Sequence, residues 1–268
     1  MTTSNVSLKQ SSLMPVIYIP HGGGPMPLLG DITHKELCAF LSNVHKNITA
    51  PKAIVIISAH WESDIATISS SPNPRMIYDY GGFPQETYEY QYPAAGQPKL
   101  AGHIASLLDD KGIGCALDPD RGYDHGTFVP LMLMYPKADI PVVQVSLLRS
   151  MDALEHIEIG AALTSLREQG VLIVGSGMSF HNSKGTHQES VNFDEWLTDT
   201  LTDGDFTQTK QRLAQWETAP SARKCHAREE HLLPLHVCFG ASIAQDKPAE
   251  KVFSGQLFDK KISAFMWQ

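Results

Sequence analysis

The sequence lacks the features that mark exported and membrane proteins. None of its 268 residues lies in an apolar run of the roughly 20 residues that a transmembrane helix needs. The first fourteen residues, MTTSNVSLKQSSLM, lack the apolar core of a signal peptide, and we expect residues 1–14 to form a flexible tail. The four cysteines form no CxxC pair, so reduced thiols and a cytoplasmic location are expected.

Positive charge is also scarce. The chain has 21 Lys and Arg against 29 Asp and Glu, a formal net charge of −8 that is spread along the sequence. Proteins that bind nucleic acid or anionic membranes need basic surface to neutralise phosphate. We therefore expect neither nucleic acid nor membrane among the partners.

Short apolar runs alternate with longer amphipathic stretches, a pattern typical of an α/β fold. No linker divides the chain, so residues 15–268 are predicted to form a single domain with a central, mostly parallel or mixed sheet flanked by helices. Strands are expected at 15–19, 53–58, 65–70, 140–147, from 170 onward and at 263–267. Helices are expected at 33–47, 98–110, 151–169, 228–242, twice within 188–222, and as a short apolar helix after a loop within 121–136. The stretch 72–98, rich in Pro, Gly and Tyr, is either a functional loop or surface packing.

Histidine is abundant, with twelve copies, and three of them follow apolar runs. His21 comes after VIYIP, His60 after VIISA, and His181 after LIVGSGMSF. Ligands of open α/β sheets bind outside the carboxyl ends of the strands. One histidine there is more often a satisfied core group, but three at equivalent positions favour a shared site.

Glycines 22–24 after His21 lack the spacing of a nucleotide-binding loop, which leaves metal or acid–base chemistry as the better interpretation. Neutral imidazole is the commonest protein ligand of Fe, Zn, Cu and Ni. The sequence pattern cannot choose the residue that completes the site; the candidates are His125, His226, His231 and His236, with Glu229 and Glu230 as ligands or as acceptors for a ligand's ring N–H. Solvated surface roles are expected for His34, His45, His103, His156 and His187.

Six short motifs in this order resemble one family. PHGGGP, SAHW, DYGGFP, YDHGTF, GSGMSFHN and REEHLLPL make residues 15 to about 265 similar to the DODA-type, LigB-like extradiol aromatic ring-opening dioxygenases. The resemblance implies that His21, His60 and His231 bind the metal. It implies that His181 is the acid–base residue, near enough to the metal to coordinate it at times, and that His125 contacts the substrate. The loop from Tyr80 to Pro84, with Gly82 and Phe83, would wall the aromatic site.

The same resemblance implies an Fe(II)-dependent, non-haem enzyme that uses O₂ to open a catechol ring beside its diol, giving a semialdehyde. A DOPA-like catechol is one candidate substrate. Two alternatives stay open: a zinc-dependent hydrolase built on the same imidazoles, or a non-catalytic metal-binding homologue. Nitrogen ligands bind Zn²⁺ more tightly than Fe²⁺, so Zn²⁺ can occupy the same site when the protein is purified.

Overall fold

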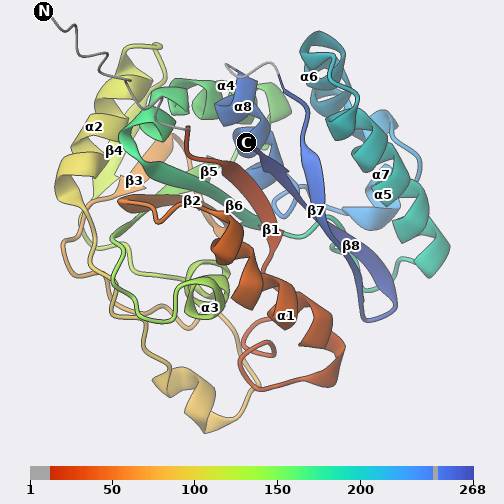
Figure 1. The fold of residues 1–268 in the computed structure, drawn as a ribbon, viewed down its shortest axis with the longest axis horizontal. Coiled ribbons are helices and arrows are strands. Elements are labelled where there is room, and N and C mark those ends of the chain that lie inside the picture. The colour runs from red at the N-terminus through yellow and green to blue at the C-terminus, as the bar shows by residue number, and fades with distance from the viewer. Residues whose placement is uncertain (1–12, 244–246) are drawn as a thin grey trace, which may run out of the picture.

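A computed structural model describes residues 13–243 and 247–268 of the chain. Eight strands form one mixed sheet in the order β4-β3-β5-β2-β6-β1-β8-β7 (Figure 1). The strands are β1 (Val16–Pro20), β2 (Ala53–Ser63), β3 (Ala66–Ser69), β4 (Cys115–Asp118), β5 (Val142–Leu148), β6 (Val171–Gly177), β7 (Glu250–Leu257) and β8 (Lys260–Trp267). The central strands β5, β2, β6 and β1 run parallel, whereas β8 pairs antiparallel with β1 and β7. The expected fold class is confirmed.

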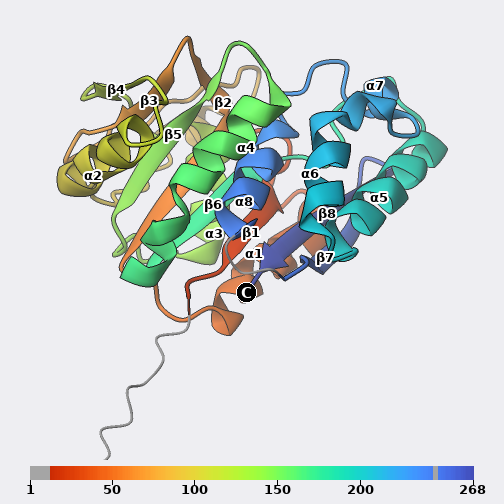
Figure 2. The same ribbon diagram turned by 90° about the horizontal axis from the view of Figure 1, so that it is seen from above.

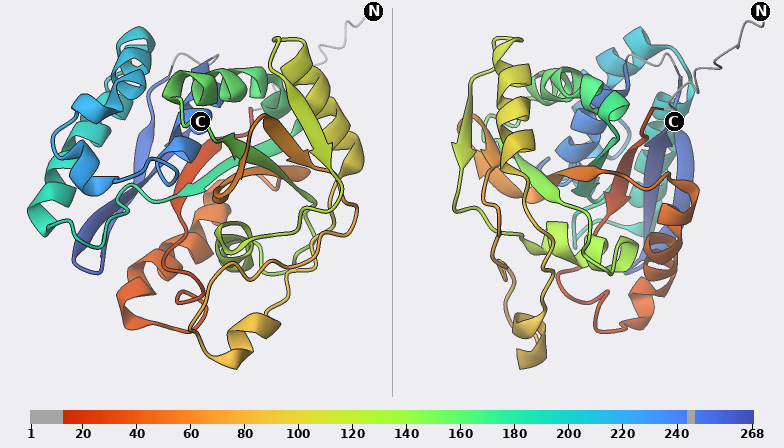
Figure 3. Two further views of the ribbon diagram at one scale, coloured as in Figure 1. Left: turned by 180° about the vertical axis from the view of Figure 1, so that it is seen from behind. Right: turned by 60° about the vertical axis from the view of Figure 1, so that its left-hand side comes forward.

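Helices cover both faces of this sheet, which explains why the central strands are apolar along their whole length. The helices are α1 (Lys35–Val44), α2 (Pro98–Asp109), α3 (His125–Met134), α4 (Ala153–Ala162), α5 (His187–Thr202), α6 (Phe206–Ala214), α7 (Ala222–Cys225) and α8 (Leu233–Ser242). One apolar layer lies beneath α2, α4 and α8, and the other beneath α1 and α3 (Figure 2). Helices α5 to α7 lie beside the β7–β8 end of the sheet (Figure 3).

Most expected elements lie close to where the pattern placed them, with some differences. The helix expected from residue 228 begins at Leu233, as α8. Strand β2 runs to Ser63 instead of ending at residue 58, because a register shift against β5 between Ile57 and Glu62 lets it continue. Strands β4 and β7 were not expected. Strand β7 is mixed in burial and gains its order by pairing with β8, a long-range contact that its own sequence does not encode.

The chain ends are described in part. Residues 1–12 of the predicted tail lie outside the described residues, so the division at residue 14 stays a prediction. Met14 is buried, and its carbonyl accepts a hydrogen bond from Arg167 Nε at 2.6 Å. All four cysteines are free thiols, as expected. Within the described ranges, no helix has the length and apolar character to cross a membrane.

Candidate metal centre

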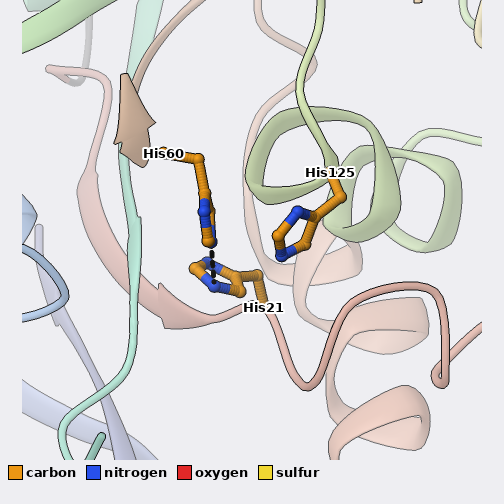
Figure 4. A group of neighbouring side chains, drawn as sticks. All are labelled: His21, His60 and His125. Carbon is orange, nitrogen blue, oxygen red and sulfur yellow. Dashed lines mark hydrogen bonds between the residues drawn. The ribbon is translucent and has the colours of Figure 1, made fainter. Parts of the chain in front are cut away.

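Three of the predicted histidines meet at the carboxyl ends of neighbouring strands. His21 follows β1 directly, His60 lies in the last part of β2, and His231 comes just before α8. The ring centroids of His21 and His60 are 4.9 Å apart, and those of His231 lie 5.3 Å and 5.0 Å from them. Figure 4 shows the first two rings facing each other, with His125 alongside. The expected convergence of His21 and His60 is therefore present.

Each of the three rings has an oxygen beside its Nδ1 atom. Ser176 Oγ lies 3.1 Å from His21 Nδ1, and because its hydroxyl donates to the Gly126 carbonyl, it accepts from the ring. Glu230 Oε1 lies 2.8 Å from His231 Nδ1. Asp79 Oδ2 lies 3.4 Å from His60 Nδ1. When Nδ1 carries the proton and donates it to such an oxygen, the lone pair of Nε2 is free to bind a metal. Histidine ligands in proteins are commonly held in this way.

The Nε2 atoms of His21 and His60 lie 3.1 Å apart. With both Nδ1 atoms protonated, no hydrogen lies between them, so two lone pairs face each other. A shared cation removes that repulsion. Two nitrogens bound at about 2.1 Å and at about a right angle are separated by about 3.0 Å, which matches this pair. The donor set therefore fits a divalent metal ion.

Burial keeps these rings in the neutral form that binds metal. Burial lowers the pKa of His21 well below its ordinary value, and the surrounding histidines lower it further. Burial also lowers the pKa of His60 to about 4, with His125 acting in the same direction. For His231, burial lowers the pKa to about 3 although Glu230 opposes the shift. All three imidazoles are ready to coordinate at neutral pH without losing a proton.

His181 stands on the open side of this cluster. Its ring stacks on His231 with centroids 3.4 Å apart, and its side chain is 49 % exposed. Glu230 Oε1, which holds His231, also lies 3.4 Å from His181 Nδ1. Burial alone would raise the pKa of Glu230, but its hydrogen bonds with His181 and His231 outweigh burial and lower it. One carboxylate thus orients two histidines. The sequence offered both Glu229 and Glu230 for this part; Glu230 takes it, whereas Glu229 binds Arg223.

A second carboxylate plays the same part on the opposite side. Asp79 Oδ1 lies 2.9 Å from His125 Nδ1 and accepts the His125 backbone N–H at 2.9 Å, while its other oxygen faces His60. Burial would raise the pKa of Asp79, yet the contacts with His125 lower it to about 2. Sequence reasoning missed both Asp79 and Ser176. Asp79 is the first residue of the DYGGFP motif, and its place in that motif could have indicated a role at the site.

His125 is placed by the start of α3. The N-cap residue Asp124 accepts the Thr127 N–H and the Ser58 hydroxyl, tying the helix to β2. Gly126 permits this approach, because a Cβ atom there would lie 2.9 Å from His60 Cδ2. The His125 and His60 ring centroids are consequently 3.9 Å apart.

The described residues hold two groups with metal-ligand spacing. The first is His21, His60 and His125, and the second is His181, Glu230 and His231. Both groups face the same centre, so His125 and His231 compete on geometry for the third ligand position. The other two sequence candidates lie elsewhere: His226 Nε2 binds the Ser179 carbonyl and His236 Nε2 binds the Leu213 carbonyl.

The DYGGFP loop is only partly beside the centre. The Tyr80 ring lies edge-on to His125 at 5.8 Å, and Phe83 packs edge-on against Tyr80 at 5.6 Å. Gly82 and Pro84 are solvent-exposed. Tyr80 and Phe83 thus form the inner part of the loop and the other two its outer part.

Two of the five histidines expected on the surface are buried. His34 is fully buried because its Nε2 accepts the Gly23 N–H at 3.0 Å, which fixes the glycine turn after His21. His156 is fully buried because its Nε2 accepts the Leu148 N–H at 3.0 Å. Both expectations were wrong, because polar sequence surroundings do not reveal a backbone donor brought from elsewhere.

Comparison with known proteins agrees with this geometry. Residues 15–264 match the family model of the catalytic LigB subunit of aromatic ring-opening dioxygenase. The chain belongs to the LigB family. It is 41 % identical to dioxygenase tasH of Hapsidospora irregularis, over 88 % of this chain and 80 % of that protein. It is 40 % identical to the 4,5-DOPA dioxygenase extradiol of Beta vulgaris, over 87 % and 88 % of the two chains.

A solved structure supports the same assignment. The crystal structure of an uncharacterized protein from Escherichia coli K12 superimposes with a TM-score of 0.76 at 29 % identity, covering 95 % of this chain and all of that one. This LigB-family chain is thus an extradiol aromatic ring-opening dioxygenase by family, with a histidine cluster suited to metal. The family implies an aromatic substrate and O₂.

Proposed function

We propose that this LigB-family protein is a non-haem Fe(II) dioxygenase that opens a catechol ring beside its diol and forms a semialdehyde. The observation that carries the proposal is the 3.1 Å approach of the His21 and His60 Nε2 atoms, each on a ring whose Nδ1 faces an oxygen. His21, His60 and His231 hold the metal. When bound, ferrous ion supplies open coordination positions and the electron transfer that lets a catechol react with O₂.

His231 is preferred to His125 as the third ligand because of its surroundings. The His231 Nδ1 atom is hydrogen-bonded to Glu230 at 2.8 Å, whereas the His125 Nδ1 atom, although 2.9 Å from Asp79, lacks the geometry of a hydrogen bond. His125 instead begins a helix beside Tyr80, at the edge of the aromatic loop. There it contacts the substrate and donates a hydrogen bond to it.

His181 acts as the general base and then the general acid. Glu230 faces its Nδ1 atom, and the ring is open to solvent on the side away from His231. Its Nε2 atom can therefore take a proton from a catechol hydroxyl and donate a proton later in the reaction, a part that histidine plays more often than any other side chain. Tyr80 and Phe83 wall the aromatic site, and Gly82 and Pro84 form the outer part of the same loop. The similarity to plant and bacterial proteins named 4,5-DOPA dioxygenase extradiol supports a DOPA-like catechol as the substrate.

Anaerobic reconstitution tests this function. The protein is loaded with Fe(II), Zn(II) or no metal, mixed with a catechol, and exposed to air. Oxygen uptake with a yellow ring-opened product only in the ferrous sample supports the proposal. Ester hydrolysis by the zinc form without oxygen uptake would indicate a hydrolase, and inactivity of every form would indicate a non-catalytic homologue.

A further inference from the structure

A separate cavity adjoins the histidine centre. It has a volume of about 320 Å³ and lies between the loop after β6 and the β7–β8 turn. Its rim includes His181 and also Gly22 and Gly23, the residues that follow His21. The floor is apolar, with Phe180 and Ile262 almost fully buried. A catechol whose ring lies against His181 would therefore direct a ring substituent into this space.

The β7–β8 turn presents an aromatic ring at the rim. Leu257 pairs with Lys260, so only Phe258 and Asp259 connect the strands, and both have positive φ, +48° and +61°. This conformation favours Asn and Gly and is unfavourable for a bulky residue such as phenylalanine. Phe258 nevertheless stays 51 % exposed, close to Gly23 and edge-on to His34 at 5.4 Å. Strain of this kind is concentrated at functional sites.

One residue with a permanent charge lines this cavity, Lys260 at the start of β8. Side chains alternate along a strand, and Lys261 accordingly lines a different hollow, together with Gln256. Within residues 13–243 and 247–268, Lys260 has no ion pair within 4.0 Å. Glu189 is near enough to feel its charge, but that carboxylate accepts the Thr186 backbone N–H at 2.7 Å. The Lys260 ammonium is thus available to a ligand.

We infer that this cavity binds the side chain of the substrate and that Lys260 pairs with a carboxylate on it. The enzyme would then favour single-ring catechols that carry a short anionic side chain. Phe258 would pack against the catechol ring or against the first carbons of that side chain. The volume is at the lower end of the range for small-molecule sites, which suits a substituent and not a second ring system. This inference rests on the proposed dioxygenase function and names its substrate class.

The test compares two probes of nearly the same size and shape, one with a charged and one with a neutral side chain: 3-(3,4-dihydroxyphenyl)propionate and its primary amide. Steady-state oxygen uptake by the ferrous full-length protein gives kcat/KM for each. We expect the wild type to favour the acid about tenfold or more, the size of one charge-assisted hydrogen bond. K260M should reduce the ratio to near one through KM, and K260R should keep most of the preference. K261M is the matched control, since it removes the same charge from the neighbouring residue and should keep the wild-type ratio.

A binding measurement separates recognition from turnover. Isothermal titration of both probes into the ferrous protein under argon should give the same order of preference, with the Kd of the acid raised in K260M. An unchanged acid-to-amide ratio in K260M overturns the inference while leaving the dioxygenase intact, as does equal loss in K261M. A wild type that takes up no oxygen with either probe refutes the proposed function and the inference together. Thermal unfolding of each variant checks folding, and K260Q replaces K260M if the latter is unfolded.

Discussion

Replacing His231 by alanine tests the ligand set most directly. The His231 ring is 4 % exposed, its Nδ1 lies 2.8 Å from Glu230, and its centroid lies about equally far from His21 and His60. Structural zinc sites with four ligands bind with about 10–16 kcal/mol, or about 2.5–4 kcal/mol per ligand. H231A should therefore weaken metal binding by about 10²- to 10³-fold.

H125A is the informative comparison, because His125 also lies within metal-ligand distance of His21 and His60 and could be the third ligand in place of His231. It should retain metal affinity within about threefold of wild type, since a substrate contact adds little to metal binding, while its turnover falls. H187A is the control, because His187 is exposed on α5 and faces Asp259. Metal affinity is measured by chelator competition with Co(II), and metal content by elemental analysis, with circular dichroism to verify folding. If H125A loses the metal and H231A keeps it, the third ligand is His125 and our assignment is wrong.

Three further predictions follow from the same geometry. H181Q should keep bound metal and lose about 10²- to 10⁴-fold in turnover, because its part is proton transfer; a metal-free variant would show that His181 is a ligand. The second prediction concerns stability. Burial lowers the pKa of His236 to about 4, from a value near 6.5 in the unfolded chain, so between pH 4 and pH 6.5 this side chain is protonated in the unfolded state but not in the folded state. Its stabilising contribution is therefore complete above pH 6.5, and about 3 kcal/mol is lost as pH falls to 4. Urea unfolding of metal-free wild type and H236N should show a steeper pH dependence in the wild type; equal slopes would disprove this. Deleting Gly81 and Gly82 should change relative kcat/KM among catechols more than metal content, and unchanged preferences would argue against a wall at this loop.

Histidines at strand ends could be recognised from sequence because the strands themselves are so apolar. Strands β1, β2 and β6 are buried along nearly all of their length, so local pattern is enough to find them and to favour a parallel sheet, although β2 continues past its predicted end. Once they are parallel neighbours, His21 and His60 must meet at one edge of the sheet. The motif order then identified the family, and the family match confirmed it.

Local pattern failed where a residue's partner is distant in the chain. His34 and His156 have polar neighbours in sequence, and only folding brings the Gly23 and Leu148 N–H groups to their rings. Strand β7 has a mixed pattern of burial because, among the described strands, it lies at the edge of the sheet beside β8.

The sequence by itself determined the α/β class, the apolar central strands and the two histidines at their ends, because these depend on short-range periodicity and on the geometry of parallel sheets. Periodicity could not choose among His226, His231 and His236, and the family resemblance indicated His231. The tertiary structure brings the His231 ring to the cluster and turns the other two rings toward backbone carbonyls. It also brought Asp79 to His60 and Glu230 to His181, and Lys260 to the cavity beside them. Side-chain direction depends on packing between elements, and that information is spread over the whole chain.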